Sequence, residues 1–341
     1  MKVLVTGMAG FIGFHLTRRL LSEGNRVVGI DNLNDYYDIS LKQARMKELG
    51  FDESLTDSEM KRSRLYGHLR FLRLDLCQRE EMDRLFAEEH FDAVINLAGQ
   101  AGVRYSIENP YAYIQSNVVG FLNVLECCRH HPVAHLVYAS SSSIYGLCEH
   151  IPYTENDMTD TPVSLYAATK KSNELMAHAY SKLYGIAATG LRFFTVYGPW
   201  GRPDMAPSIF LEAMLQRRPI RLFNHGNMRR DFTYVDDIVD GISLVLSHPS
   251  QKEVPHRVYN IGNGHPVALL DFVKALERVS GCRAICKMEA LQPGDVVQTY
   301  ADTRRLAHDF GYRPQVGVDE GVKRFYDWYV RYYGTGDTQL N

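Results

Sequence analysis

Cysteines are few and scattered in this sequence of 341 residues. There are six, at positions 77, 127, 128, 148, 282 and 286. None shows the Cys-x-x-Cys spacing that is typical of zinc sites and redox motifs. The pattern disfavours a disulfide framework, and we predict reduced thiols and no metal site.

Long apolar runs and an excess of one charge are also missing. No apolar run approaches the ~18 residues that a membrane-spanning helix needs, and no signal-like apolar core follows the first residues. The 38 Lys and Arg residues nearly balance the 40 Asp and Glu residues, for a net charge of -2. We therefore expect a cytoplasmic protein with a small-molecule partner, and neither nucleic acid nor a membrane surface as a partner.

The beginning of the chain has the pattern of a strand, a glycine turn and a helix. Apolar residues 2–6 lead into Gly7, Gly10 and Gly13, and an amphipathic segment follows. Glycines let the backbone approach a pyrophosphate, whose charge the N–H groups and dipole of the helix start can receive. Because of its position after a strand, we interpret this turn as a dinucleotide site.

An acidic residue stands where such a site needs one. The next predicted strand, residues 26–30, ends at Asp31, 18 residues after Gly13. An acid about 20 residues after the last glycine binds the adenosine ribose hydroxyls. Asp31 would repel a 2′-phosphate, and the neighbouring Asn32 offers no cation, so we predict NAD rather than NADP as the cofactor.

Predicted strands alternate with predicted helices through the first half of the chain. Further strands are expected at residues 69–74, 93–97, 134–139 and 187–193, and helices at 39–49, 78–89, 111–130 and 166–184. This alternation predicts an α/β protein with a Rossmann-like, doubly wound parallel sheet. The polar residues 52–64 have the composition of a surface excursion.

The regular alternation stops near residue 195. Mixed helices and short strands follow, which predicts a smaller mixed α/β C-terminal substrate lobe. Residues 235–246 and 258–261 have the pattern of elements that return to the first sheet. We therefore expect an NAD-binding domain at 1–195, rejoined by about 235–262, a substrate lobe at 196–234 and 263–333, and a tail at 334–341.

Tyr166 and Lys170 stand one helical turn apart on the same face. A tyrosine titrates near pH ~10, and a base that works near neutrality needs about 4 kcal/mol of extra stabilisation of its phenolate. Lys170 and a bound cationic nicotinamide ring can each supply part of it. Ser140, Ser141, Ser142 and Ser143 follow a predicted strand at the sheet edge where α/β proteins place their chemistry. The combination predicts proton removal coupled to hydride transfer.

A group of arginines lies within fourteen positions of the predicted substrate lobe. Its members are Arg217, Arg218, Arg221, Arg229 and Arg230. A guanidinium fork suits a diphosphate. These residues form either a solvated face or a diphosphate clamp.

Taken together, the motifs resemble the extended short-chain dehydrogenase/reductase family over residues 2–333. They comprise the glycine turn, Asp31, Asp75-Leu76, the serine row, the Tyr166 and Lys170 pair, and residues 191–194, 230–237 and 293–295. Within that family the chain is most similar to nucleotide-sugar epimerases that act on UDP-glucuronate. This closer similarity rests on residues 31–38, 100–106 and 198–206.

The resemblance implies roles for individual residues. Tyr166 would be the general base, Lys170 would lower its pKa, and Ser141 would bond the reacting hydroxyl. The implied cofactor residues are Gly7, Gly10, Phe11, Ile12, Gly13, Asp31, Asn32, Asp75, Leu76, Leu97, Ala98, Gln100, Asn117, Tyr166, Lys170 and Phe193. The implied UDP-sugar residues are Arg104, Ser141, Ser142, Ser143, Thr195, Arg202, Phe223, Arg230 and Asp295, with Arg230 on the diphosphate.

The implied reaction is NAD-dependent epimerisation of UDP-glucuronate to UDP-galacturonate through a 4-keto sugar. UDP-glucose/UDP-galactose 4-epimerisation is the alternative, because the preference for a carboxylate rests mainly on Thr195. A 4,6-dehydratase or a decarboxylase is disfavoured, because Ser142 and Ser143 stand where the resemblance would require acidic residues. The resemblance also implies a homodimer formed through helices 111–130 and 166–184.

Overall fold

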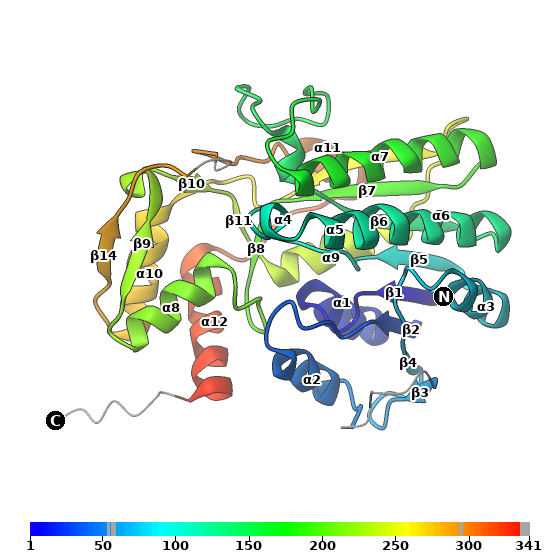
Figure 1. The fold of residues 1–341 in the computed structure, drawn as a ribbon, viewed down its shortest axis with the longest axis horizontal. Coiled ribbons are helices and arrows are strands. Elements are labelled where there is room, and N and C mark those ends of the chain that lie inside the picture. The colour runs from blue at the N-terminus through cyan, green and yellow to red at the C-terminus, as the bar shows by residue number, and fades with distance from the viewer. Residues whose placement is uncertain (53–54, 56–58, 293–295, 335–341) are drawn as a thin grey trace.

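Eight strands form the central sheet, in the order β12-β7-β6-β5-β1-β2-β4-β3 (Figure 1). They are β1 (Lys2–Thr6), β2 (Arg26–Asp31), β3 (Lys61–Arg62), β4 (Leu69–Arg73), β5 (Ala93–Asn96), β6 (His135–Ser141), β7 (Ala188–Phe193) and β12 (His256–Ile261). All neighbours pair in parallel except β3 with β4. The computed structural model describes residues 1–52, 55, 59–292 and 296–334.

Helices cover both faces of this sheet (Figure 1). On one face α1 (Phe11–Ser22) packs against α9 (Val235–Leu246), and on the other α6 (Gly120–His130) packs between α3 (Arg79–Glu89) and α7 (Leu165–Tyr184). Two separate hydrophobic cores result. Along β1, Val3 and Val5 belong to the first core and Leu4 to the second, because successive strand side chains point to opposite faces. The predicted doubly wound α/β sheet is confirmed.

The predicted helix at 111–130 is interrupted. Its region holds α5 (Pro110–Tyr113), a π-helical segment (Ile114–Val119) and α6. Asn109 and Pro110 begin the first piece, since the Asn109 side chain accepts a bond from the N–H of Ala112. The wide π turn occurs where the backbone oxygen of Asn117 accepts a bond from the Asn173 amide. Residue periodicity alone does not distinguish this segment from a continuous helix.

The polar residues 52–64 were expected to be a surface excursion. Within their described part, β3 pairs antiparallel with β4 at the edge of the sheet. Two residues of polar character carry too little periodicity to predict a strand, and the neighbouring β4 supplies the pairing partner. This short antiparallel strand is a correction to the predicted all-parallel order.

The second lobe combines small sheets with helices. Its strand pairs are β8 (Thr195–Tyr197) with β11 (Phe232–Tyr234), β9 (Pro219–Leu222) with β14 (Ile285–Met288), and β10 (Arg229–Arg230) with β13 (Val267–Ala268). Its helices include α8 (Ala206–Leu215), α10 (Leu269–Ser280), α11 (Arg304–Phe310) and α12 (Val318–Tyr333). As expected, β12 returns to the main sheet beside β7. The exact division into lobes stays a prediction, and the expected tail from residue 335 lies outside the described residues.

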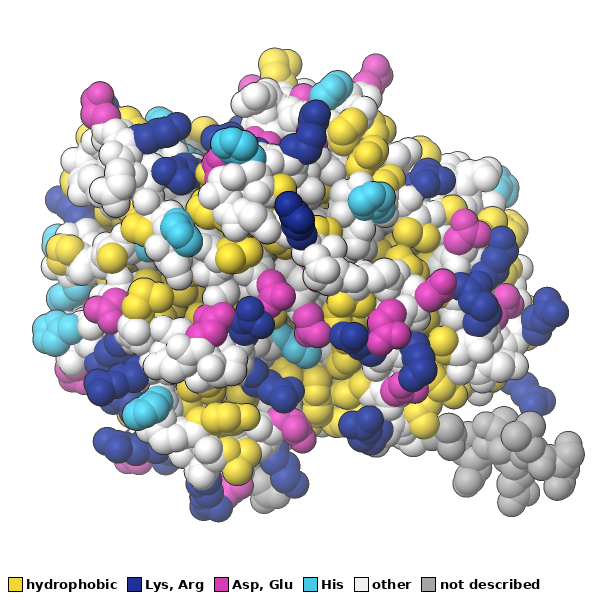
Figure 2. Space-filling view, turned by 180° about the vertical axis from the view of Figure 1, so that it is seen from behind, with side chains coloured by type: hydrophobic (Ala, Val, Ile, Leu, Met, Phe, Trp, Pro, Cys, Tyr) yellow, Lys and Arg dark blue, Asp and Glu magenta, His cyan; other side chains and the backbone are white. Residues whose placement is uncertain are grey.

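Charges on the surface are mixed rather than segregated. Figure 2 shows basic and acidic side chains interspersed over one whole face of the molecule. Among the helices of the described residues, none is long and apolar enough to cross a membrane.

Candidate active site

A cavity of about 1110 Å³ lies where the carboxyl ends of the main strands face the second lobe. It gathers nearly all the residues that the sequence analysis selected. The lining includes Gly7, Gly10, Phe11, Ile12, Gly13, Asp31, Asn32, Asp75, Leu76, Leu97, Ala98, Gln100, Tyr166, Lys170 and Phe193. It also includes Arg104, Ser141, Ser142, Ser143, Thr195, Arg202, Phe223 and Arg230. Asn117 is absent from it, and Asp295 lies outside the described residues.

The glycine turn forms one end of this cavity. Helix α1 begins at Phe11, and Gly10 precedes it without a side-chain cap. Gly7 has a φ of 72°, and a Cβ atom at Gly13 would lie 2.1 Å from the Gly7 carbonyl oxygen. Larger residues would therefore open the turn. The bare start of the helix, with its N–H groups and positive dipole, fits the pyrophosphate of a dinucleotide.

Asp31 lies beside this turn at the end of β2. Its carboxylate accepts bonds from the N–H groups of Ala9, at 3.1 Å, and Leu33, at 2.8 Å. The Nζ atom of Lys42 is 4.0 Å away and also lines the cavity. A cation near Asp31 was not expected, because Lys42 belongs to α2 (Ile39–Glu48). Lys42 approaches the Asp31 carboxylate only in the folded chain.

Asn117 lies behind the cavity wall. Its side chain accepts a bond from the N–H of Gln100 at 2.7 Å and donates to the Gln100 carbonyl at 3.0 Å. It also donates to Thr169 at 3.0 Å. Asn117 therefore supports Gln100, which lines the cavity. Asn117 itself does not line the cavity, although the resemblance implies that it contacts the cofactor directly.

Tyr166, Lys170 and Ser141 line the same cavity, and Tyr166 is hydrogen-bonded to Ser141. Burial raises the pKa of Tyr166, whereas a side-chain hydrogen bond with Ser141 and the charge of Arg202 oppose that rise. The Nζ atom of Lys170 donates to the backbone oxygen of Ala139 at 3.0 Å. Burial lowers the pKa of Lys170 to about 8. Helix α7 and the end of β6 thus bring Tyr166, Lys170 and Ser141 to the same cavity.

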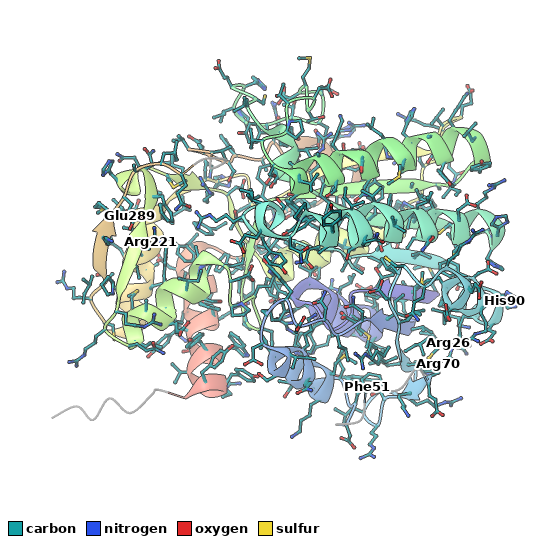
Figure 3. The ribbon with its side chains drawn as sticks, in the orientation of Figure 1. Arg26, Phe51, Arg70, His90, Arg221 and Glu289 are labelled. Carbon is teal, nitrogen blue, oxygen red and sulfur yellow. The ribbon has the colours of Figure 1, made fainter. Side chains whose placement is uncertain are left out.

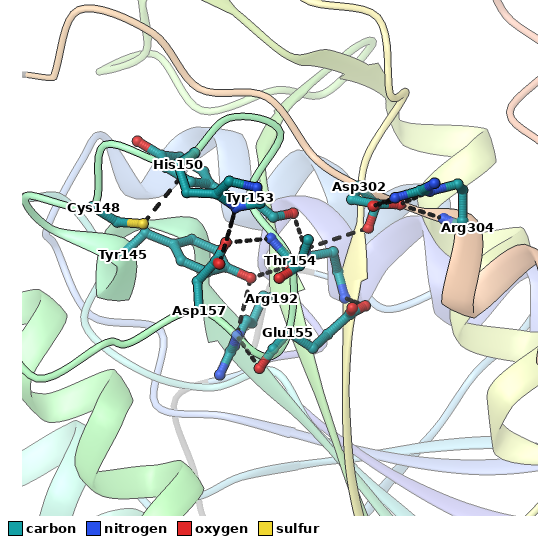
Figure 4. A network of polar contacts seen from close by, with 11 residues as sticks. Tyr145, Cys148, His150, Tyr153, Thr154, Glu155, Asp157, Arg192, Asp302 and Arg304 are labelled. Carbon is teal, nitrogen blue, oxygen red and sulfur yellow. Dashed lines mark hydrogen bonds and ion pairs between the residues drawn. The ribbon is translucent and has the colours of Figure 1, made fainter.

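A buried ion pair lies directly behind the serine row. Arg192 on β7 binds both carboxylate oxygens of Glu174 on α7, at 2.9 and 2.8 Å. Ser140 donates to the same carboxylate at 2.6 Å, and Arg192 also donates to Tyr145 at 2.9 Å (Figure 4). This network holds β6, β7 and α7 together. The sequence analysis missed it, although Glu174 follows Lys170 by four residues on the same helical face.

Arginines on the second-lobe side already have partners. Arg218 pairs with Glu212 at 3.0 Å, and Arg221 pairs with Glu289 at 2.6 Å; Figure 3 shows the latter two side chains close together on β9 and after β14. Arg230 donates to two backbone oxygens. Arg217 and Arg229 do not line the cavity. The five arginines therefore form neither one solvated face nor one clamp. Arg218, Arg221 and Arg230 line the cavity, whereas the other two do not.

Two further contacts shape this side. The Arg104 guanidinium lies 4.8 Å from the centre of the Phe223 ring, which joins the loop after β5 to the second lobe. Arg202 binds Asp204, with its Nε atom 3.0 Å from the carboxylate. Within the described residues no group of three or more side chains suited to a metal ion was found.

Known proteins are similar to this chain in sequence and in fold. The model of the "NAD dependent epimerase/dehydratase family" matches residues 3–262. A probable UDP-glucuronate 4-epimerase of Rhizobium meliloti is 44% identical over 100% of both chains, and UDP-glucuronate 4-epimerase 2 of Arabidopsis thaliana is 43% identical over 99% of this chain and 78% of its own. The crystal structure of UDP-glucuronic acid 4-epimerase from Bacillus cereus, in complex with UDP-glucuronic acid and NAD, has a TM-score of 0.87 and 33% identity, and the match covers 98% of this chain and 100% of that chain. The glycine turn shares its cavity with Tyr166 and Lys170, as expected from these matches. The chain belongs to the NAD-dependent epimerase/dehydratase family, the extended branch of the short-chain dehydrogenases/reductases.

Proposed function

We propose that this enzyme converts UDP-glucuronate to UDP-galacturonate, with tightly held NAD as the cofactor. The observation that carries the proposal is that Tyr166, Lys170 and Ser141 open into the same cavity as the glycine turn and Asp31. Similarity to UDP-glucuronate 4-epimerases over the whole chain supports the choice of substrate.

When bound, NAD would supply the hydride chemistry at carbon 4 of the sugar, as acceptor in one direction and donor in the other. The protein handles the proton. Tyr166 removes it from the 4-hydroxyl and gives it back, while Ser141 holds that hydroxyl in place. Gly7, Gly10 and Gly13 receive the pyrophosphate, and Asp31 binds the adenosine ribose. The sugar turns over between the two transfers, which gives the epimer.

Tyr166 needs help to act as a base. The sequence analysis expected Lys170 to lower its pKa, yet burial raises the pKa of Tyr166 in the protein by itself, and Ser141 and Arg202 only oppose this rise. Lys170 donates to the Ala139 backbone and lies beside the cavity. In our proposal a bound, positively charged nicotinamide ring would add to the stabilisation of the Tyr166 phenolate, because opposite charge favours the ionised form.

The sugar carboxylate selects the substrate in this proposal. Ser142, Ser143 and Thr195 line the sugar end of the cavity and offer hydroxyl donors to it. Serines at 142 and 143 leave no acid and base there for 4,6-dehydration. UDP-glucose/UDP-galactose 4-epimerisation is the second candidate, because the same Tyr166 and Lys170 chemistry acts on a neutral sugar and only the hydroxyl contacts distinguish the two.

The test is to incubate the purified protein separately with UDP-glucuronate and UDP-glucose and to resolve the products by chromatography. We expect UDP-galacturonate from the first and little UDP-galactose from the second. Efficient turnover of UDP-glucose alone would replace the acidic substrate with the neutral one. No product from either would refute the proposal.

We also propose that the enzyme is a homodimer. Helices α6 and α7 pack side by side, and their outer side includes Leu122, Leu175 and Leu183, which are 38%, 60% and 69% exposed. A second copy would cover these apolar side chains. Light scattering should give twice the chain mass at micromolar concentration and the single mass for Leu175→Glu. Leu65→Glu, at a site 65% exposed elsewhere, is the matched control and should stay dimeric. A cytoplasmic location stays a prediction.

A further inference from the structure

One segment of the second lobe crosses the glycine turn. Residues 198–204, here called the strap, connect β8 to the start of α8. At its beginning, Pro199 and Trp200 contact α1 and Arg45 rather than the cavity. At its other end, Arg202 and Asp204 line the cavity itself. The two ends are held very differently.

The beginning of the strap is anchored by buried groups. Arg45 of α2 is fully buried, and its guanidinium donates to the Trp200 oxygen at 2.7 Å and to the Ala9 oxygen of the glycine turn at 2.8 Å. The Nε2 atom of His15 lies 2.8 Å from the Pro199 oxygen. Trp200 packs on Phe14 at a centroid distance of 5.6 Å. One arginine thus ties the strap to the glycine turn.

At the far end the strap binds Tyr36, which also accepts a bond from Arg202 at 3.5 Å, and Ser208 of α8 donates to the Arg202 backbone oxygen at 2.9 Å. The hydroxyl of Tyr36, in the loop that follows Asp31, donates to the Asp204 carboxylate at 3.0 Å. The same carboxylate binds Arg202, and its side chain is 32% exposed. A Cβ atom at Gly102 would lie 2.5 Å from the Tyr36 hydroxyl. The wall of the cavity leaves room for this hydroxyl because residue 102 has no side chain.

The difference in burial suggests how the strap moves. Arg45 and Trp200 could separate only by exposing a buried guanidinium, which is costly. The Tyr36 and Asp204 bond lies at the cavity surface, where water can replace it at modest cost. Contacts of the second kind open in local fluctuations, while buried anchors stay closed. The strap therefore has a fixed end and an openable end.

We propose that the Tyr36 to Asp204 hydrogen bond is a clasp that keeps the strap closed over bound NAD. Closing it joins the loop after Asp31 to the strap across the cavity that would hold the dinucleotide. It also holds Arg202, whose charge opposes the rise in the pKa of Tyr166. An enzyme that regenerates its cofactor within each cycle gains by retaining it. The proposal rests on the proposed function only for the identity of the cofactor.

The experiment measures how fast NAD leaves the protein. The purified enzyme, loaded with radiolabelled NAD, is chased with excess unlabelled NAD without any sugar. Tyr36→Phe removes only the hydroxyl, and we expect dissociation about tenfold faster, the ratio that corresponds to about 1.4 kcal/mol. Asp204→Leu, which has a similar shape but no hydrogen-bond acceptor, should be faster by a similar ratio. The double variant should be little faster than either single one, because both break the same contact.

Tyr105→Phe is the matched control. Tyr105 stacks on Tyr36 at 4.9 Å and lines the cavity, but its hydroxyl accepts a bond from Asn109 and not from the strap. We expect its NAD dissociation rate to stay close to that of the parent, because the ring is kept and no bond to the strap is lost.

Equal rates for Tyr36→Phe, Tyr105→Phe and the parent would overturn the clasp, and so would fully additive effects in the double variant. If Tyr36→Phe does not fold, Asp204→Leu alone decides, against the same control. The result is independent of the sugar. A protein inactive on UDP-glucuronate would refute the proposed function and would leave the NAD rates as a valid test of the clasp.

Discussion

The two ends of the cavity are built in different ways. At the cofactor end, Gly7, Gly13 and Asp31 come from a single stretch of 25 residues, and backbone bonds from Ala9 and Leu33 hold the Asp31 carboxylate. At the sugar end, Arg202, Arg218 and Arg221 are brought from the second lobe, and each is paired with a carboxylate of the protein. The cofactor end is preformed, whereas at the sugar end an incoming anion competes with existing partners.

In our proposal NAD stays bound while the sugar nucleotide must leave after each turnover, and the difference between the two ends fits these roles. A preformed site loses little free energy to rearrangement and retains its ligand. When an arginine exchanges a carboxylate partner for a phosphate, the net binding free energy is only the difference between two similar interactions. Such weak net binding suits a substrate that must leave. The following predictions test this comparison.

The largest effect is expected at Tyr166, where the two ends meet. Tyr166→Phe removes the proton acceptor, and we expect epimerisation to fall about 10³-fold, within the range of general acid-base catalysis. Binding of NAD and UDP should persist, as titration of each would show. Tyr180→Phe is the control, because its hydroxyl lies on the same helix but binds Glu126. Activity of Tyr166→Phe within a few fold of the parent would remove it from this role.

The cofactor end should be sensitive to one carboxylate. Asp31→Asn removes a charged acceptor, and bonds to charged groups contribute about 1.5–3 kcal/mol, so NAD affinity should fall about tenfold or more. Discrimination against NADP should narrow, because the repulsion of a 2′-phosphate is lost. Calorimetric titration of both dinucleotides measures this. Asp35→Asn, exposed in the same loop, should change neither affinity.

The sugar end should respond in product partition. Oxidation at carbon 4 of UDP-glucuronate gives a β-keto acid. This acid loses carbon dioxide when the bond to its carboxylate stands perpendicular to the carbonyl plane, so the enzyme has to keep the carboxylate out of that orientation. Thr195→Val keeps the shape and removes one hydroxyl. We expect roughly tenfold slower epimerisation and a larger share of decarboxylated UDP-4-keto-pentose, by mass spectrometry. UDP-glucose is the control substrate, and equal losses on both sugars would count against carboxylate recognition.

The smallest effect is expected where an arginine loses its internal partner. Arg221 pairs with Glu289 while its side chain is 60% exposed. Exposed ion pairs contribute about 0–1 kcal/mol, so Glu289→Gln should tighten UDP binding by no more than about fivefold. The gain should shrink as salt is added. Glu253→Gln, which frees the distant Lys182, is the control. Weaker UDP binding in Glu289→Gln would show that Glu289 positions Arg221 rather than competing for it.

Predictability follows the same division. Residues 2–31 could be interpreted from sequence because strand, turn and helix are consecutive and their contacts are local. The family resemblance implied that Asn117 contacts the cofactor, yet its side chain, within the interrupted helix, binds Gln100. The arginines were treated as one group because they are close in sequence, but the pairing of β9 with β14 brings Glu289 to Arg221 and the others diverge.

The sequence by itself determined the doubly wound sheet, the glycine turn and the spacing of Tyr166 and Lys170, because each depends on periodicity or on residues within one helical turn. Only the tertiary structure decided which charges neutralise one another. Lys42 reaches Asp31, Glu174 meets Arg192, and Tyr36 meets Asp204 across 168 positions of the chain. Such pairs depend on where the chain returns after long connections, and no local pattern in the sequence encodes that distance.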